Sequence, residues 1–112
     1  MDNLKSFKEL FESEGSNTVK FKRWTCTVDK GEYSNGRIAL ELNNVKDGEP
    51  VLVASVNVPS EKIAKDEVII KTYSENEGIL DVLINAKIIS TPIRTIDIGM
   101  AADGGAVCKV LI

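Results

Sequence analysis

The chain has 112 residues, a formal net charge of −3 at pH 7 and no histidine. Its length fits one hydrophobic core, so we expect residues 1–112 to form a single domain. Without histidine, Ser-His and Cys-His nucleophile pairs are excluded, and two cysteines alone cannot build a zinc site. We therefore predict a protein that is not an enzyme, with no catalytic residues, no metal site and no cofactor.

The distribution of charge and apolar residues restricts the partners and the compartment. The densest basic stretch holds only Lys20, Lys22 and Arg23. We therefore do not expect the protein to bind nucleic acid directly. No apolar run reaches the roughly 18 residues of a membrane span, and the first residues lack an apolar signal core. These features predict a cytoplasmic protein without a membrane partner, in which Cys26 and Cys108 are reduced thiols of the core.

The first segment, DNLKSFKELFESEG, has a helical pattern. Its apolar residues recur at the spacing of one helix face: Leu4, Phe7, Leu10 and Phe11. We predict a short amphipathic helix over residues 3–14 that packs on the rest of the domain. The alternative is a helix that offers its two phenylalanines to a partner.

Residues 18–59 have the pattern of an antiparallel β-meander. In TVKFKRWTCTVDK the apolar positions change parity between Phe21 and Trp24, which predicts one strand with a bulge or bend near Lys22-Arg23. The dipeptides Asn35-Gly36 and Asp47-Gly48 are typical of tight hairpin turns. A third strand is predicted to run to Pro59, because proline cannot donate to a continuing ladder.

Residues 66–112 predict a strand, a helix and a hairpin. A strand is expected around residues 67–71, and Asp103-Gly104-Gly105 is typical of the turn of a closing hairpin. Taken together, the segments predict an α+β fold, in which an antiparallel sheet of about six strands carries the N-terminal helix and one capped helix. The sheet could also curl into a partly closed barrel.

The start of the second helix, in YSENEGILDVLI, matches a capping box. Ser74 and Glu77 have the required spacing, so we assign Ser74, Glu77 and Gly78 to a structural cap. Replacing Ser74 with alanine should then cost about 1 kcal/mol. Asn76 adds nothing to such a cap, and its replacement is expected to leave stability nearly unchanged. The alternative is that this stretch also contacts a partner.

Four motifs in order resemble those of a family of small proteins of unknown function from bacteria, phages, plasmids and conjugative elements. The motifs are KGEYSNGRIALEL, VASVNVP, YSENEG and VCKV, and the resemblance spans about residues 30–110. It implies a gene carried by mobile DNA, and a place of action in the bacterial cytoplasm. Small proteins of such elements often bind a host protein or another protein of the element.

We therefore expect a non-enzymatic binding protein of a phage or mobile element, with anti-restriction or anti-CRISPR inhibition as the implied class. The expected protein-binding residues are polar or aromatic side chains in turns and caps: Tyr33, Asn35, Arg37, Tyr73, Glu75 and Asn76. Two alternatives remain open. One is a module that self-associates through a strand edge or through its N-terminal helix. The other, less favoured, is an enzyme that uses the carboxylates of Glu75, Glu77 and Asp81.

Overall fold

The computed structural model describes residues 17–112, which form seven strands, one α-helix and one turn of 3-10 helix. In chain order the elements are β1 (Thr18–Phe21), β2 (Trp24–Glu32), β3 (Ile38–Asn44), β4 (Pro50–Val53), β5 (Glu67–Lys71), η2 (Ser74–Asn76), α2 (Ile79–Asn85), β6 (Arg94–Ile98) and β7 (Ala101–Lys109). The α+β prediction is confirmed at this level. The helix predicted for residues 3–14 lies outside the described residues.

The first four strands pair in sequence order as an antiparallel meander, β1-β2-β3-β4. The predicted bulge near Lys22-Arg23 is wrong, because the chain reverses there and Phe21 pairs with Trp24 across a hairpin. Cross-strand partners share one face of a sheet, and this explains why the apolar parity changes at that point. The turns at Gly36 and Gly48 are confirmed, and both glycines have positive φ angles, of 87° and 75°.

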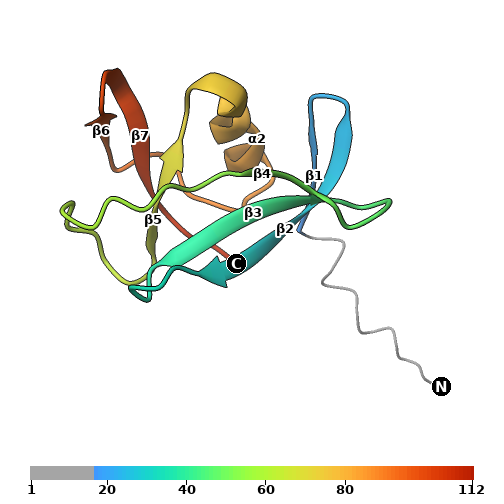
Figure 1. Cartoon of the computed structure of the whole chain (residues 1–112), viewed down its shortest axis with the longest axis horizontal. Coiled ribbons are helices and arrows are strands. Elements are labelled where there is room, and N and C mark those ends of the chain that lie inside the picture. Colours follow the sequence, from blue (N-terminus) through green and yellow to red (C-terminus); the bar gives the residue numbers. More distant parts are fainter. Residues whose placement is uncertain (1–16) are drawn as a thin grey trace.

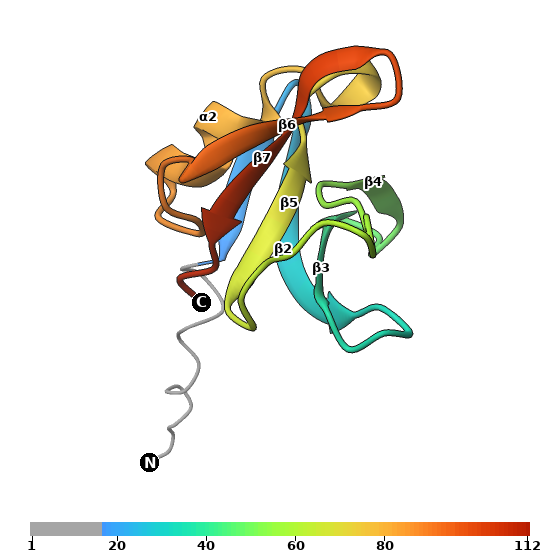
Figure 2. The same ribbon diagram turned by 90° about the vertical axis from the view of Figure 1, so that its left-hand side faces the viewer.

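The second sheet has the order β5-β7-β6, and all its pairs are antiparallel (Figure 2). The expected closing hairpin is present, but its turn lies at Gly99-Met100, between β6 and β7. The prediction that Asp103-Gly104-Gly105 forms this turn is wrong, since all three residues belong to β7. Asp103 has a φ of 55°, and the register of the pair shifts between Ile96 and Ile98.

The two sheets meet where the chain changes its pairing partner after β4. The amide of Ala54 donates to the carbonyl of Leu40 in β3 at 2.8 Å, whereas the carbonyl of Ala54 accepts from Lys71 in β5 at 2.9 Å. A single bridge then pairs Ser55 with Ile70. The predicted single sheet is therefore two sheets, and the strands within residues 17–112 form no closed barrel. The strand that was predicted to run to Pro59 is β4, and it ends at Val53.

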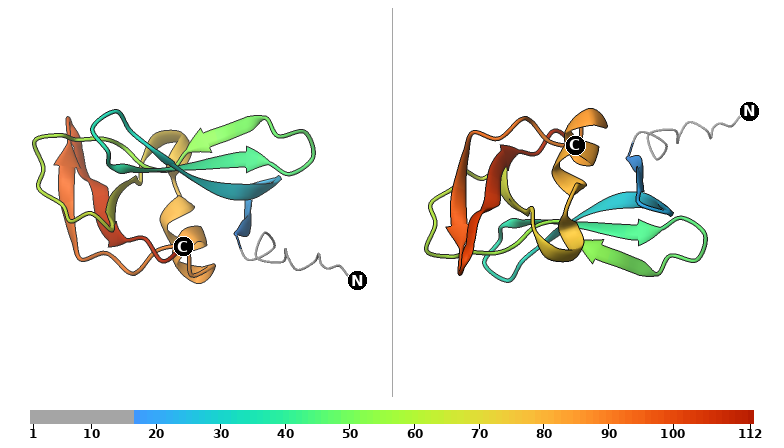
Figure 3. Two further views of the ribbon diagram at one scale, coloured as in Figure 1. Left: turned by 90° about the horizontal axis from the view of Figure 1, so that it is seen from below. Right: turned by 90° about the horizontal axis from the view of Figure 1, so that it is seen from above.

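Helix α2 lies between the β1-β2 hairpin and the β5-β7-β6 sheet (Figures 1 and 3). It buries Ile79 and Leu83, while Asp81 and Asn85 on its other side are exposed. The core to which it contributes includes Phe21, Cys26, Val28, Leu40, Leu42, Val68, Ile70, Ile88, Ile89 and Cys108. Among the described residues, no helix is long and apolar enough to cross a membrane.

Candidate functional site

The β2-β3 loop positions three of the expected binding residues, and all three make structural hydrogen bonds. The Oδ1 atom of Asn35 accepts from the amide of Arg37 at 3.2 Å, which closes the turn. The Nδ2 atom of Asn35 donates to Oδ1 of Asn57 at 3.2 Å. The guanidinium of Arg37 donates to the carbonyl oxygens of Val58, at 2.8 Å, and Glu61, at 2.5 Å. Asn35 and Arg37 therefore attach this loop to the connection that follows β4.

Tyr33 extends this attachment to Ser55. The two hydroxyl oxygens are 2.8 Å apart, and Oγ of Ser55 also accepts from the amide of Leu40 at 3.0 Å. Ser55 is only 4% exposed, so its hydroxyl needs these partners in place of water. The phenol of Tyr33 thus covers a buried polar group at the point where β4 leaves its sheet.

The predicted capping box at Ser74 and Glu77 does not form. Ser74 has a φ of 61°, in the left-handed region, and begins the 3-10 turn η2, whereas a capping serine needs an extended backbone. Neither η2 nor α2 has a side-chain capping hydrogen bond. The α-helix begins later than predicted, with Gly78 as its N-cap residue at a φ of 92°. Glycine adopts this angle without a Cβ clash, which gives Gly78 a structural role.

Asn76, expected on the surface, is completely buried. Its Nδ2 atom donates to the carbonyl of Val53 at 2.9 Å, at the end of β4. Its Oδ1 atom has no hydrogen-bond partner within residues 17–112. The expected surface position of Asn76 is therefore wrong, and we now expect its replacement to lower stability, because a buried amide donor satisfies a strand-end carbonyl.

Glu75 and Tyr73 remain accessible: the side chain of Glu75 is 61% exposed, and Tyr73 is half-buried. The carboxylate of Glu75 pairs with the ammonium of Lys71 at 3.0 Å, and the Lys71 Nζ atom lies 5.0 Å from the centre of the Tyr73 ring. The hydrogen bond from Lys71, and then those from its own backbone and from Ser74, lower the pKa of Glu75 to about 2. Glu75 is therefore a fixed negative charge at neutral pH.

The two groups of expected residues meet on one segment of the chain, residues 53–61. Asn76 binds Val53, Tyr33 binds Ser55, and Asn35 and Arg37 bind residues 57–61. Four of the six expected binding residues thus hold this segment in place. Within residues 17–112 there is also no group of three carboxylate or cysteine side chains that could hold a metal ion.

A different surface, on the open face of the first sheet, combines charge with apolar area. The register places Asp29 beside Glu41 and Glu41 beside Val53 on three adjacent strands. The Nδ2 atom of Asn43 donates to both carboxylates, at 2.5 Å to Asp29 and at 3.5 Å to Glu41. We call this surface the acidic sheet face, and define it by Asp29, Tyr33, Ala39, Glu41 and Val53. Together with Lys30, Gly31 and Glu32, these residues line an open hollow of about 350 Å³. The ammonium of Lys30 donates to the carbonyl of Ile112 at 2.7 Å.

The sequence analysis missed the acidic sheet face. Alternation along β3 already places Glu41 opposite to the core residues Leu40 and Leu42. What alternation does not show is which residue of β2 stands next to Glu41, because that depends on the register of the hairpin. A shift of one residue would have separated the two carboxylates onto opposite faces.

Both cysteines are free thiols of the core, as predicted. Burial raises the pKa of Cys26, and it raises the pKa of Cys108 to about 11. Both thiols are therefore protonated at neutral pH, and neither has the character of a nucleophile.

Comparison with known proteins identifies no relative: no family model, no curated protein and no solved structure matches this chain. The resemblance to proteins of mobile elements stays an expectation from the four motifs alone.

Proposed function

We propose that this protein is a non-enzymatic binding protein that attaches to a basic surface of a partner protein through its acidic sheet face. The observation that carries the proposal is the direct pairing of Asp29 with Glu41 beside an exposed Val53. Like charges directly opposite each other on a sheet destabilise the fold. The Nδ2 atom of Asn43 offsets part of this repulsion, and a cationic side chain of a partner would offset more of it.

The apolar part of the same face supports a protein partner. Val53 is 45% exposed, and Tyr33 and Ala39 border the same hollow. Interfaces bury an apolar centre with aromatic residues and keep charged groups at the rim. Complementary charge steers association and selects the partner. Here the two carboxylates would supply the charge complementarity, and Val53 and Tyr33 the buried area.

The expected biological setting agrees with this surface. The motif resemblance implies a protein of a phage or mobile element that acts on a host or element protein. Enzymes that cut or bind nucleic acid carry concentrated Lys and Arg side chains for the phosphates. A counter-defence inhibitor that covers such a basic groove would use an acidic, apolar-centred face of this kind.

The test compares two double variants with the same loss of charge. Asp29→Asn with Glu41→Gln removes the paired carboxylates, and Glu77→Gln with Asp81→Asn removes two exposed ones on the side of α2. Each tagged protein is used to capture partners from a bacterial host lysate, and the affinity for the captured protein is then measured.

We expect wild type and control to bind a basic protein alike, and the sheet-face variant to bind at least about tenfold more weakly, with a smaller dependence on salt. Circular dichroism establishes that both variants are folded. Equal binding by the two variants would contradict the proposed surface. If the Val53→Asp variant also binds the partner as tightly as wild type, the sheet face is not the binding site.

A further inference from the structure

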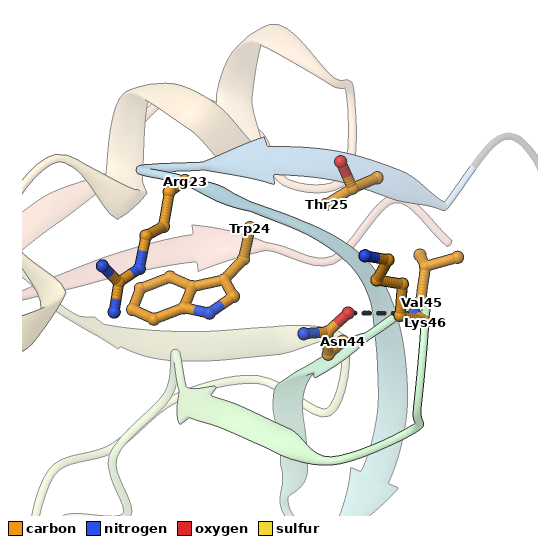
Figure 4. A pocket seen from close by; sticks show the side chains of 6 residues that line it. All are labelled: Arg23, Trp24, Thr25, Asn44, Val45 and Lys46. Atoms are coloured by element: carbon orange, nitrogen blue, oxygen red, sulfur yellow. Dashed lines mark hydrogen bonds between the residues drawn. The ribbon is translucent and has the colours of Figure 1, made fainter.

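A second hollow, at the opposite end of the first sheet, has a different chemical character. It lies between the β1-β2 hairpin and the loop after β3, has a volume of about 450 Å³, and is lined by Arg23, Trp24, Thr25, Asn44, Val45 and Lys46. We call it the tryptophan pocket. Figure 4 shows Arg23 and Trp24 on one side of it and Asn44, Val45 and Lys46 on the other. Its volume is within the range of small-molecule sites, about 300–1,000 Å³.

The polar side chains of the tryptophan pocket can all donate hydrogen bonds, and two of them are cations. The Oδ1 atom of Asn44 accepts from the amide of Lys46 at 2.9 Å, so the Nδ2 atom is turned toward Trp24 (Figure 4). Within residues 17–112, neither this nitrogen nor the indole nitrogen of Trp24 has a protein acceptor. None of the described residues that line the pocket is a carboxylate, although the whole chain has a net charge of −3. The pocket therefore suits a ligand with negative charge and several acceptors.

The walls of the pocket are held in place by the fold. The amide of Val45 donates to the carbonyl of Thr25 at 3.0 Å, which joins the loop after β3 to β2. The amide of Gly48 donates to the carbonyl of Asn44 at 2.7 Å and closes the same loop. The guanidinium carbon of Arg23 lies 5.0 Å from the centre of the Trp24 ring. Because this stack orders the guanidinium in advance, less side-chain entropy is lost when an anion binds.

We propose that the tryptophan pocket binds a nucleotide. The indole of Trp24 would stack against the base, and the ammonium of Lys46, on the facing wall, would bind the phosphate. The guanidinium of Arg23, beside the ring, would add positive charge. The nitrogen of Asn44, on the wall that faces Trp24, remains as a donor for a ring acceptor of the nucleobase (Figure 4). This site is separate from the acidic sheet face and does not depend on the function proposed for that face.

The geometry favours a free nucleotide over a nucleic-acid strand. Strand-binding proteins offer several aromatic rings in succession along a basic groove. Among the lining residues within 17–112, Trp24 is the only aromatic side chain, and Arg23 and Lys46 are the only cations. One base and one phosphate group are sufficient for such a lining.

Fluorescence provides a direct test, because Trp24 is the only tryptophan of the chain. Adenosine monophosphate should quench the fluorescence in a saturable manner. Adenosine, which lacks the phosphate, and ribose 5-phosphate, which lacks the base, should each bind at least about tenfold more weakly. A thymidine oligomer should bind no more tightly than thymidine monophosphate, and calorimetry should give the same order of affinities.

The matched variants are Lys46→Ala and Lys65→Ala, since both remove one exposed lysine and Lys65 lies outside the pocket. We expect Lys46→Ala to weaken binding of adenosine monophosphate about tenfold and Lys65→Ala to leave it unchanged. Arg23→Gln gives a second loss, and calorimetry measures it because Arg23 stacks on the fluorescent Trp24 ring.

The proposal is overturned if adenosine, guanosine, cytidine and thymidine monophosphates all leave the fluorescence and the heat of mixing unchanged at millimolar concentration. It is equally overturned if Lys46→Ala and Lys65→Ala bind alike. Tighter binding of the oligomer than of the monophosphate would replace the free nucleotide with a nucleic-acid strand as the ligand.

Discussion

Asn76 combines complete burial with a half-satisfied amide. Its nitrogen binds the carbonyl of Val53, and its Oδ1 atom has no partner among the described residues. The donor end is important because Val53 is the last residue of β4, where the chain leaves the β3 ladder. Without this bond a backbone carbonyl would be left unpaired near the core.

Replacing Asn76 with alanine should lower the free energy of unfolding by about 1–3 kcal/mol, because the Val53 carbonyl then loses its donor. The control is Asn85→Ala, an exposed asparagine of α2, for which we expect a change within about 0.5 kcal/mol. Urea denaturation measures both. Equal values for the two variants would show that the buried amide contributes no stability.

The lowered pKa of Glu75 makes the stability of the folded protein depend on pH. Its pKa is about 2 in the folded protein, compared with an ordinary value of 4.5, and the hydrogen bond from Lys71 is the largest cause. Because the folded pKa is depressed, the stabilisation is complete above pH 4.5 and is lost as the pH falls toward 2.

Lys71→Gln should therefore raise the pKa of Glu75 toward its ordinary value. Carboxyl NMR titration of Glu75 measures this shift, and Lys65→Gln serves as the control because Lys65 has no contact with Glu75. A variant in which Glu75 still titrates near pH 2 would show that the backbone and Ser74 alone hold the carboxylate in its charged form.

At the scale of elements, β7 contains two glycines where the sequence predicted a turn. A Cβ atom on Gly104 would lie 2.9 Å from Cδ1 of Tyr73 and 2.8 Å from Cβ of Ala101. A Cβ atom on Gly105 would lie 2.9 Å from the side chains of both Ile69 and Ile96. These glycines are therefore needed for close packing in a strand, and not for a chain reversal.

Gly104→Ala should destabilise the protein by about 1–3 kcal/mol, since the added methyl group overlaps the Tyr73 ring and Ala101. Gly31→Ala is the matched control, because Gly31 lies in β2 with no atom within 4 Å of an added Cβ. We expect a change within about 0.5 kcal/mol for the control. Thermal unfolding followed by circular dichroism distinguishes the two. A Gly104→Ala protein as stable as the control would mean that β7 can shift at no cost.

At the scale of the whole molecule, the connection between the sheets is held by contacts from both sides. Arg37 binds two carbonyls of the connection from the β2-β3 loop. Arg94 of β6 binds the carboxylate of Glu61 at 2.7 Å and the carbonyl of Lys62 at 2.6 Å. The β2-β3 loop of the first sheet and strand β6 of the second thus hold the same connection, which ties the two sheets together.

Arg37→Lys keeps the charge but cannot reproduce two diverging N–H donors, so the connection should open more often. Trypsin cleavage after Lys62 and Lys65 should become about fivefold faster or more, because the loss of one hydrogen bond raises the population of the open connection by about this factor. Fragments are identified by mass spectrometry, and Arg23→Lys, at the far hairpin, should show the wild-type rate. Unchanged cleavage would show that Arg94 alone is sufficient.

The predictions that succeeded rest on local patterns. Alternation located β3, the strand expected around residues 67–71 is β5, and the Asn-Gly and Asp-Gly dipeptides located two turns. The predictions that failed assumed a backbone conformation or a degree of exposure that the folded chain does not have. Ser74 and Glu77 have the spacing of a capping box, yet the left-handed backbone of Ser74 prevents it.

Residue order was sufficient for the α+β class, for most strand positions and for the burial of both cysteines, because these follow from periodicity and side-chain polarity over a few neighbouring residues. The division into two sheets, the burial of Asn76, the pairing of Asp29 with Glu41 and the tryptophan pocket required the folded chain. Each of these depends on residues that are distant in sequence and meet in one register. Local patterns leave that register open, and the energy of packing the whole core selects it.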